Sequence, residues 1–313
     1  MLFNVDNLID TKRKILRRFN YVNLFWEKDP RPFFIIAGYT RSGTTFYGDL
    51  LGYILRARTI HEPLNPENVK EISFFHKRES AAVIRNSDNH KKAISFIFGP
   101  KFKGNRRTNH MGLFFYRERR IVKIVRGNFY LDLLSEMLPH VKFFSVIIRH
   151  PCACVASRMA LGWDIPDQSK SIGDVWHKLN SDQKKIINNS DSYHVKLAIS
   201  WALDNMMALE NIHNASFKFI YYENLLLDTQ NQLKDILTFI GKNYTLYENR
   251  IRHEIAMQQR IHKSEPMKQL FGWREKLQAK FIDEILKVVS IFQLDYLYDY
   301  KTHMPNNVFS DNN

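Results

Sequence analysis

The stretch FFIIAGYTRSGTT, residues 33–45, constrains the fold of this chain more than any other feature. An apolar run that ends in glycine is typical of a buried parallel strand, and the segment that follows, TTFYGDLLGYIL (44–55), has helical periodicity. The turn between such a strand and helix directs backbone N–H groups and the positive end of the helix at one point. We therefore predict an anion site, formed by Gly38, Arg41, Ser42, Gly43, Thr44 and Thr45.

This turn departs from the usual phosphate loop of nucleoside triphosphatases. Gly38 and Gly43 fit the spacing G-x-x-x-x-G-K-[ST], but Thr44 stands where the lysine is expected. A triphosphatase also needs an aspartate at a strand end for magnesium, and none of the later apolar runs ends in that way. Arg41 instead places a permanent charge and a planar guanidinium inside the turn, which suits an oxyanion. A magnesium-dependent kinase is therefore the weaker interpretation.

Further apolar runs lie at 119–125, 142–149 and 217–223, and each precedes a segment with helical periodicity. Alternating strands and helices imply a parallel sheet with helices on both faces. The sequence thus predicts an α/β fold, a single P-loop-like domain at 31–305 with a central parallel sheet flanked by helices. A basic helical segment is predicted at 1–30, either packed on the domain or in contact with a membrane surface or another anionic partner.

Charge and cysteine content bound the partners and the compartment. Lys and Arg outnumber Asp and Glu 46 to 32, which gives a net charge of +14 and indicates a polyanion among the ligands. A phosphorylated cofactor, an acidic glycan, an anionic membrane and nucleic acid all satisfy this criterion. The two cysteines, Cys152 and Cys154, suit a reducing compartment, and no run of eighteen apolar residues occurs. We expect a cytoplasmic protein with possible peripheral membrane contact.

A second block contains the sequence FFSVIIRHPCACVASRM. A strand ending near Arg149 delivers this residue to the carboxyl edge of the sheet, where ligands bind in open α/β folds. Pro151 suits the first turn of the next helix, because its missing N–H would have no partner there. Ser157, on that helix, carries a hydroxyl that could join Arg149 on a phosphate.

These two blocks resemble motifs of the sulfotransferase family that uses 3′-phosphoadenosine 5′-phosphosulfate (PAPS). YTRSGTTFYGDLLG resembles the family's 5′-phosphosulfate loop, and the Arg-x-Pro block with its later serine resembles the 3′-phosphate motif. FIYYENLLLDTQNQLKDILTFIG is similar to a third family segment. The resemblance spans roughly 31–300, including a looser C-terminal match. It implies that PAPS and its product, 3′-phosphoadenosine 5′-phosphate (PAP), bind without a metal at Thr40, Arg41, Ser42, Gly43, Thr44, Thr45, Arg149, Ser157, Lys263 and Ser264.

The resemblance also implies in-line attack by an acceptor, with a base that takes its proton and a cation at the leaving oxygen. Arg41 occupies the place of that cation, and Lys123 would face the sulfate or the acceptor. The histidine that cytosolic family members place shortly after this lysine is absent. Glu62 is the preferred base, and His61 is the alternative, because neighbours in an extended segment point to opposite sides. Efficient catalysis near neutral pH would need either a raised pKa for Glu62 or a lowered pKa for the proton of the acceptor.

The acceptor is left open by the sequence: a small molecule, a glycan or a lipid all fit, and no nucleic acid partner is expected. A different class of function, a basic polyanion-binding protein on an inactive sulfotransferase fold, would need clustered aromatic and basic residues. Segments 102–107 and 114–120 have that composition, but they suit an acceptor-binding region equally well.

Overall fold

The fold is described from a computed structural model of the whole chain. The structure describes the following residues: 26–76, 79–105, 107–109, 116–117, 119–163, 165, 169–261, 266–306 and 308–309. Within these ranges, no helix is both long enough and apolar enough to cross a membrane. Residues 1–25 of the basic helical segment predicted at 1–30 lie outside the described residues. Trp26–Glu27 form a short strand, β1, which pairs with β4 (Tyr116–Arg117), so the helical prediction is wrong at these two positions.

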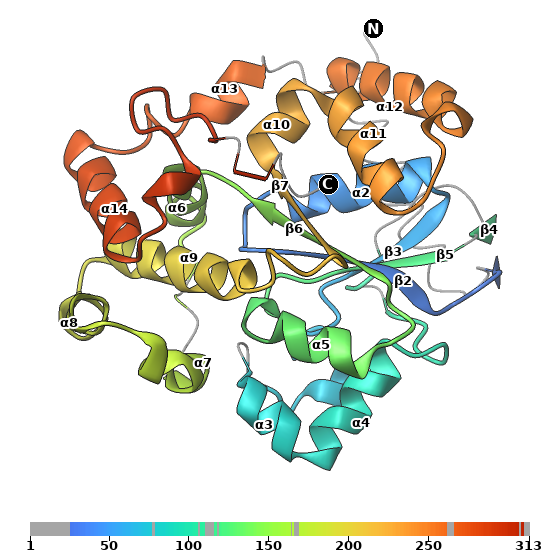
Figure 1. Cartoon of the computed structure of the whole chain (residues 1–313), viewed down its shortest axis with the longest axis horizontal. Helices are drawn as coiled ribbons and strands as arrows, with labels where there is room; N and C mark the ends of the chain where they lie inside the picture. The colour runs from blue at the N-terminus through green and yellow to red at the C-terminus, as the bar shows by residue number, and fades with distance from the viewer. Residues whose placement is uncertain are drawn as a thin grey trace, which may run out of the picture.

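A five-stranded parallel sheet forms the centre of the molecule (Figure 1). Its order is β3-β5-β2-β6-β7, so β2 lies in the middle. Ile36 of β2 lies beside Lys123 of β5 on one side and Ser145 of β6 on the other. The predicted parallel α/β architecture is confirmed. The strands are β2 (Pro32–Gly38), β3 (Ala57–His61), β5 (Arg119–Lys123), β6 (Phe143–Ile148) and β7 (Phe217–Tyr221).

Helices follow the strands along the chain and cover both faces of the sheet (Figure 1). The first group is α2 (Thr44–Ile54), α3 (Ala81–Asn86), α4 (Asp88–Ile97), α5 (Leu131–Met137), α6 (Pro151–Met159), α7 (Ser169–Val175) and α8 (Ser181–Asn189). The second is α9 (Tyr193–Leu209), α10 (Tyr222–Leu227), α11 (Thr229–Phe239), α12 (Glu248–Ile261), α13 (Pro266–Phe271) and α14 (Ala279–Ile291).

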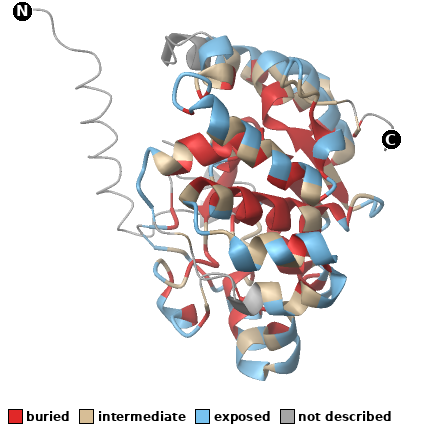
Figure 2. Ribbon diagram, turned by 90° about the vertical axis from the view of Figure 1, so that its left-hand side faces the viewer, coloured by how far each residue is buried: buried red, intermediate tan, exposed pale blue. Residues whose placement is uncertain are grey.

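The alternation of side chains along β2 divides the apolar core between the two faces. Phe34 and Ile36 pack in a cluster with residues of α2 and α11. Ile35 and Ala37 pack in a larger cluster with residues of α5, α6, α9 and α14. Figure 2 shows the buried residues in the central strands and on the inner sides of these helices, with exposed residues on the outside. Because β2 is buried on both faces, it reads as a continuous apolar run.

Two further differences from the sequence predictions concern strands beside the cleft. β3, with the sequence ARTIH, is an additional strand that the sequence analysis did not predict, because three of its residues are polar. All five residues are buried. The predicted strand 217–223 is shorter, because α10 begins at Tyr222 and places Tyr222 and Glu223 on a helix. Both differences matter for function, since Glu62 follows β3 and Tyr222 follows β7.

Candidate functional site

The turn between β2 and α2 leaves an uncapped helix N-terminus at the sheet edge. Arg41 and Gly43 have left-handed backbone conformations, with φ of 71° and 95°. Gly43 is the N-cap residue of α2, and no side chain caps the helix there. The N–H groups of the first turn therefore lack intrahelical acceptors and carry the positive end of the helix dipole. This local geometry suits an anion, as the sequence predicts.

A cleft of about 940 Å³ opens at the carboxyl ends of the strands. Residues from the segments that follow all five strands line it. They are Thr40, Arg41, Gly43, Thr44, Thr45 and Phe46 after β2; Glu62, Asn65 and Glu67 after β3; Lys123, Val125 and Arg126 from β5; Arg149, Arg158, Gly162, Trp163 and Ile165 after β6; and Tyr222 after β7. Ser42 does not line this cleft, because it is fully buried behind the turn.

A second pocket, of about 360 Å³, adjoins the cleft and shares Arg41, Arg149 and Tyr222 with it. Its other walls come from α6 and from the region of α13, namely Ala153, Ala156, Ser157, Lys268, Gln269, Gly272, Trp273 and Lys276. An extended ligand with two anionic groups could therefore contact the uncapped helix in the cleft and the cationic walls of the pocket.

Three predicted residues meet where the cleft and the pocket join. Arg41 Nε donates to Ser157 Oγ at 2.9 Å, and Arg149 Nη1 donates to the Arg41 carbonyl at 3.1 Å. Pro151 is the first residue of α6, as predicted, so Ser157 lies within that helix. The Nε atom of Arg149 is buried and has no hydrogen-bond partner in the described part of the chain. Arg149 Nη2 donates to the Gln269 carbonyl of α13 at 3.1 Å, so the guanidinium is held between the turn and α13.

Tyr222 joins the two anion-binding segments, a role that the sequence analysis missed. A Cβ atom added to Gly43 would lie 2.2 Å from Cδ2 of the Tyr222 ring, so the ring packs directly on the turn. The Arg149 guanidinium carbon lies 4.4 Å from the centre of the same ring, within the range of a cation–π contact. The only signal in the sequence was the resemblance of the segment around Tyr222 to a family motif.

Glu62 lies among cations at the edge of the cleft. It directly follows β3, has φ of 46°, and its carboxylate accepts from Lys123 Nζ at 2.7 Å and Arg126 Nη1 at 3.3 Å. Burial raises the pKa of Glu62, but the charge and hydrogen bond of Lys123 and the charge of Arg126 outweigh it, and the pKa lies below its ordinary value. The raised pKa that efficient catalysis would favour is therefore not found.

His61 points away from the cleft. It is 2% exposed, its Nε2 lies 3.3 Å from Asp49 Oδ1 of α2, and it is absent from the residues that line either pocket. Of the two neighbours, Glu62 alone reaches the site. Lys263 and Ser264 lie outside the described residues. A search of the described residues finds no group of three or more His, Cys, Asp or Glu side chains that could hold a metal.

Comparison with known proteins places this geometry in a family context. The sulfotransferase family model matches residues 32–245. Curated protein sequences give no match. Among solved structures, the chain is similar to mouse sulfotransferase SULT7A1 complexed with PAP, with 13% identity, a TM-score of 0.47, and 90% of each chain covered. It is also similar to sulfotransferase STF9 from Mycobacterium avium, with 14% identity, a TM-score of 0.44, and 84% and 75% of the two chains covered.

Proposed function

The chain belongs to the sulfotransferase family, and we propose that it moves a sulfuryl group from PAPS to an acceptor hydroxyl or amine. One observation carries the proposal: Arg41, Arg149 and Ser157 contact one another where the anion-binding turn meets the second pocket. A nucleotide with phosphates at both ends of its ribose needs two linked anion sites of this kind. We also propose one domain over 31–305, since α14 packs against α6 and α9.

The residues present fit the donor. The first turn of α2, with Thr44 and Thr45, and the Arg41 side chain would hold the 5′-phosphosulfate, since the helix is uncapped there. Arg149 and Ser157 would hold the 3′-phosphate, since both line the second pocket and a charged guanidinium and a hydroxyl suit a phosphate. PAPS supplies the sulfuryl group, and the bond from sulfur to the bridging phosphate oxygen breaks as the acceptor oxygen or nitrogen bonds to sulfur.

The charged residues of the cleft provide the remaining chemistry. We propose that Glu62 accepts the proton of the acceptor, since its carboxylate lines the cleft and is held by Lys123 and Arg126. Arg41 would stabilise the charge that develops on the leaving phosphate oxygen. Lys123 has a second proposed role beside orienting Glu62: the residue is buried but lines the cleft, and its ammonium group would face the transferred sulfuryl group.

Replacing Arg149 or Ser157 by Ala tests the assignment of the 3′-phosphate site. Both substitutions should weaken the binding of PAP much more than that of adenosine 5′-phosphate, because only PAP carries the 3′-phosphate that Arg149 and Ser157 would contact. Hydrogen bonds to charged groups contribute about 1.5 to 3 kcal/mol, which corresponds to a loss in affinity of about 10- to 150-fold. Calorimetry with both nucleotides measures the difference, and Arg252→Ala, at an exposed position on α12, is the control. Equal losses for the two nucleotides would show that these residues bind another part of the ligand.

A further inference from the structure

The acceptor side of the cleft has an exposed aromatic ring beside the proposed reaction centre. Trp163 is 48% exposed and lines the cleft, and the Arg41 guanidinium carbon lies 6.0 Å from the centre of its ring. Tyr193 of α9 donates its hydroxyl proton to the Trp163 carbonyl, which fixes the backbone at this position. An acceptor that reaches the sulfuryl group would therefore pass along the face of an indole ring.

Hydrogen-bonding groups share one turn with the proposed base. Asn65 N donates to the Glu62 carbonyl at 3.1 Å, and the Asn65 carbonyl accepts from Asn68 N at 2.9 Å. Asn65 Oδ1 accepts from Glu67 N at 3.2 Å. Asn65 and Glu67 both line the cleft, and the bond from Glu67 N holds the Asn65 amide in the turn that follows Glu62.

The composition of the walls favours some acceptor classes over others. Sites for steroids or long-chain alcohols are lined mainly by apolar side chains, because burying unpaired polar groups against an apolar ligand is costly. Among the described residues that line this cleft beyond α2, charged and polar side chains outnumber apolar and aromatic ones, which are Val125, Trp163, Ile165 and Tyr222. A ligand with many hydroxyl groups and one apolar face matches such walls better.

We infer that the acceptor is a polyhydroxylated, sugar-like molecule that stacks one ring face on Trp163 and hydrogen-bonds to Asn65 and Glu67. This inference rests on the proposed sulfotransferase function and specifies its acceptor. An aromatic ring offers a large rigid surface for the C–H face of a sugar ring, while a few fixed polar groups select its hydroxyls. One of those hydroxyls would then lie between Glu62 and the sulfuryl group.

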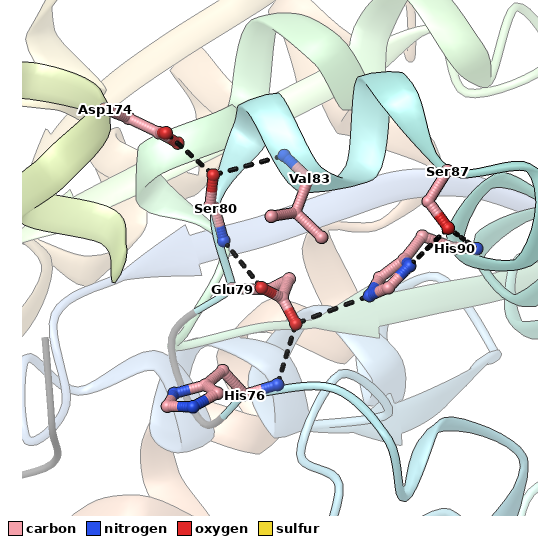
Figure 3. A network of polar contacts seen from close by, with 7 residues as sticks. All are labelled: His76, Glu79, Ser80, Val83, Ser87, His90 and Asp174. Atoms are coloured by element: carbon pink, nitrogen blue, oxygen red, sulfur yellow. Dashed lines mark hydrogen bonds and ion pairs between the residues drawn. The ribbon is translucent and has the colours of Figure 1, made fainter. Parts of the chain in front are cut away.

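A polar network joins α7 to the N-terminus of α3 (Figure 3). Asp174 of α7, on the segment that follows Trp163, accepts from Ser80 Oγ at 2.7 Å and from Ala82 N at 3.3 Å. Glu79, on the segment that follows Glu67, accepts from His76 N at 2.8 Å and from Ser80 N at 3.1 Å. These bonds hold α7 against the N-terminus of α3, whose N-cap residue is Ser80.

The test is transfer of labelled sulfate from PAPS to two sets of probes. The first contains cellotetraose, chitotetraose and mannotetraose, and the second contains p-nitrophenol and a 3-hydroxysteroid. We expect a sugar to be sulfated, and Trp163→Ala to lower kcat/KM for it about 10-fold or more, as for aromatic hot spots. Trp163→Phe should retain most of the activity. Tyr296→Ala removes another exposed aromatic side chain, outside the cleft, and should change nothing.

Binding of PAP, measured separately by calorimetry, distinguishes failure of the sugar inference from failure of the proposed function. If PAP binds but only the phenol or the steroid is sulfated, or no probe is, the sugar inference is overturned and the proposed nucleotide site stands. Unchanged sugar turnover in Trp163→Ala would also overturn it. If PAP does not bind, the proposed function itself fails.

Discussion

We expect Glu62→Gln to lower turnover by about 100-fold or more and to leave the affinity for PAP unchanged. General bases contribute about 10²- to 10⁴-fold to rates, and the amide keeps the shape of the side chain while it loses the ability to accept the proton. The carboxylate lines the cleft, whereas the buried His61 faces α2. The measurement is single-turnover transfer of labelled sulfate to the best acceptor in the panel, with PAP affinity determined by calorimetry.

The pH dependence of turnover separates the two candidate bases. Because the ion pairs hold the pKa of Glu62 below its ordinary value of 4.5, this carboxylate stays charged down to that value. Its contribution to stability is likewise present above pH 4.5 and is lost as the pH falls through the lower, folded-state pKa. Turnover should therefore show no loss from this group between about pH 5 and 8. A loss of turnover within this range would show that a group other than Glu62 acts as the base.

His61→Ala provides the comparison. If this variant still binds PAP but is inactive, while Glu62→Gln turns over like the unmodified protein, the base is His61 and the assignment of Glu62 is wrong. Lys123→Met gives an independent check, because loss of the ammonium group should raise the pKa of Glu62 and move the acid limit of activity to higher pH.

Gly43→Ala should lower the affinity for PAP by about 100-fold or more, equivalent to about 2.7 kcal/mol of binding free energy. The new Cβ would lie 2.2 Å from the Tyr222 ring, which is closer than real Cβ atoms approach any neighbour. Arg149, which we propose contacts the 3′-phosphate, packs on the same ring. A movement of the ring that relieves the clash would therefore displace Arg149 as well as the turn. The left-handed φ of 95° adds a conformational cost of about 1–2 kcal/mol.

Gly241→Ala is the matched control for this result. Gly241 also has a positive φ, 65°, but no atom lies within 4 Å of its added Cβ. The conformational cost should therefore appear in the free energy of unfolding without a change in PAP affinity. If Gly43→Ala binds PAP like the unmodified protein, the turn does not hold the nucleotide in the conformation described.

Sequence reasoning found the parts of the site that lie in continuous stretches. The anion-binding turn occupies consecutive residues, and Arg149 and Ser157 are separated by one helical segment, so local periodicity places them. Their mutual contact was not predictable, because the bond from Arg41 to Ser157 joins positions 116 residues apart. The same holds for Tyr222, whose ring contacts Gly43 only after β7 has joined the sheet.

The electrostatics of Glu62 show a different limit. Its pKa depends on Lys123, 61 residues away, and on Arg126, both brought close because β3 pairs with β5. β3 is too polar to be recognised as a strand from an apolar run. Without β3, the approach of Glu62 to Lys123 and Arg126 cannot be inferred. The acceptor wall around Trp163 lies in a segment of weak periodicity, which gave no signal for a particular residue.

Calorimetric titration with PAP in the presence of EDTA tests the central claim most directly, with ATP plus magnesium as the parallel titration. The two anion sites consist of backbone N–H groups, hydroxyls and fixed cations, so PAP should bind saturably with and without the chelator, and far more tightly than ATP with magnesium. Binding of ATP only with magnesium would instead indicate a kinase. Failure of both nucleotides to bind would indicate an inactive fold that serves as a basic polyanion-binding protein, and either result would contradict the proposed function.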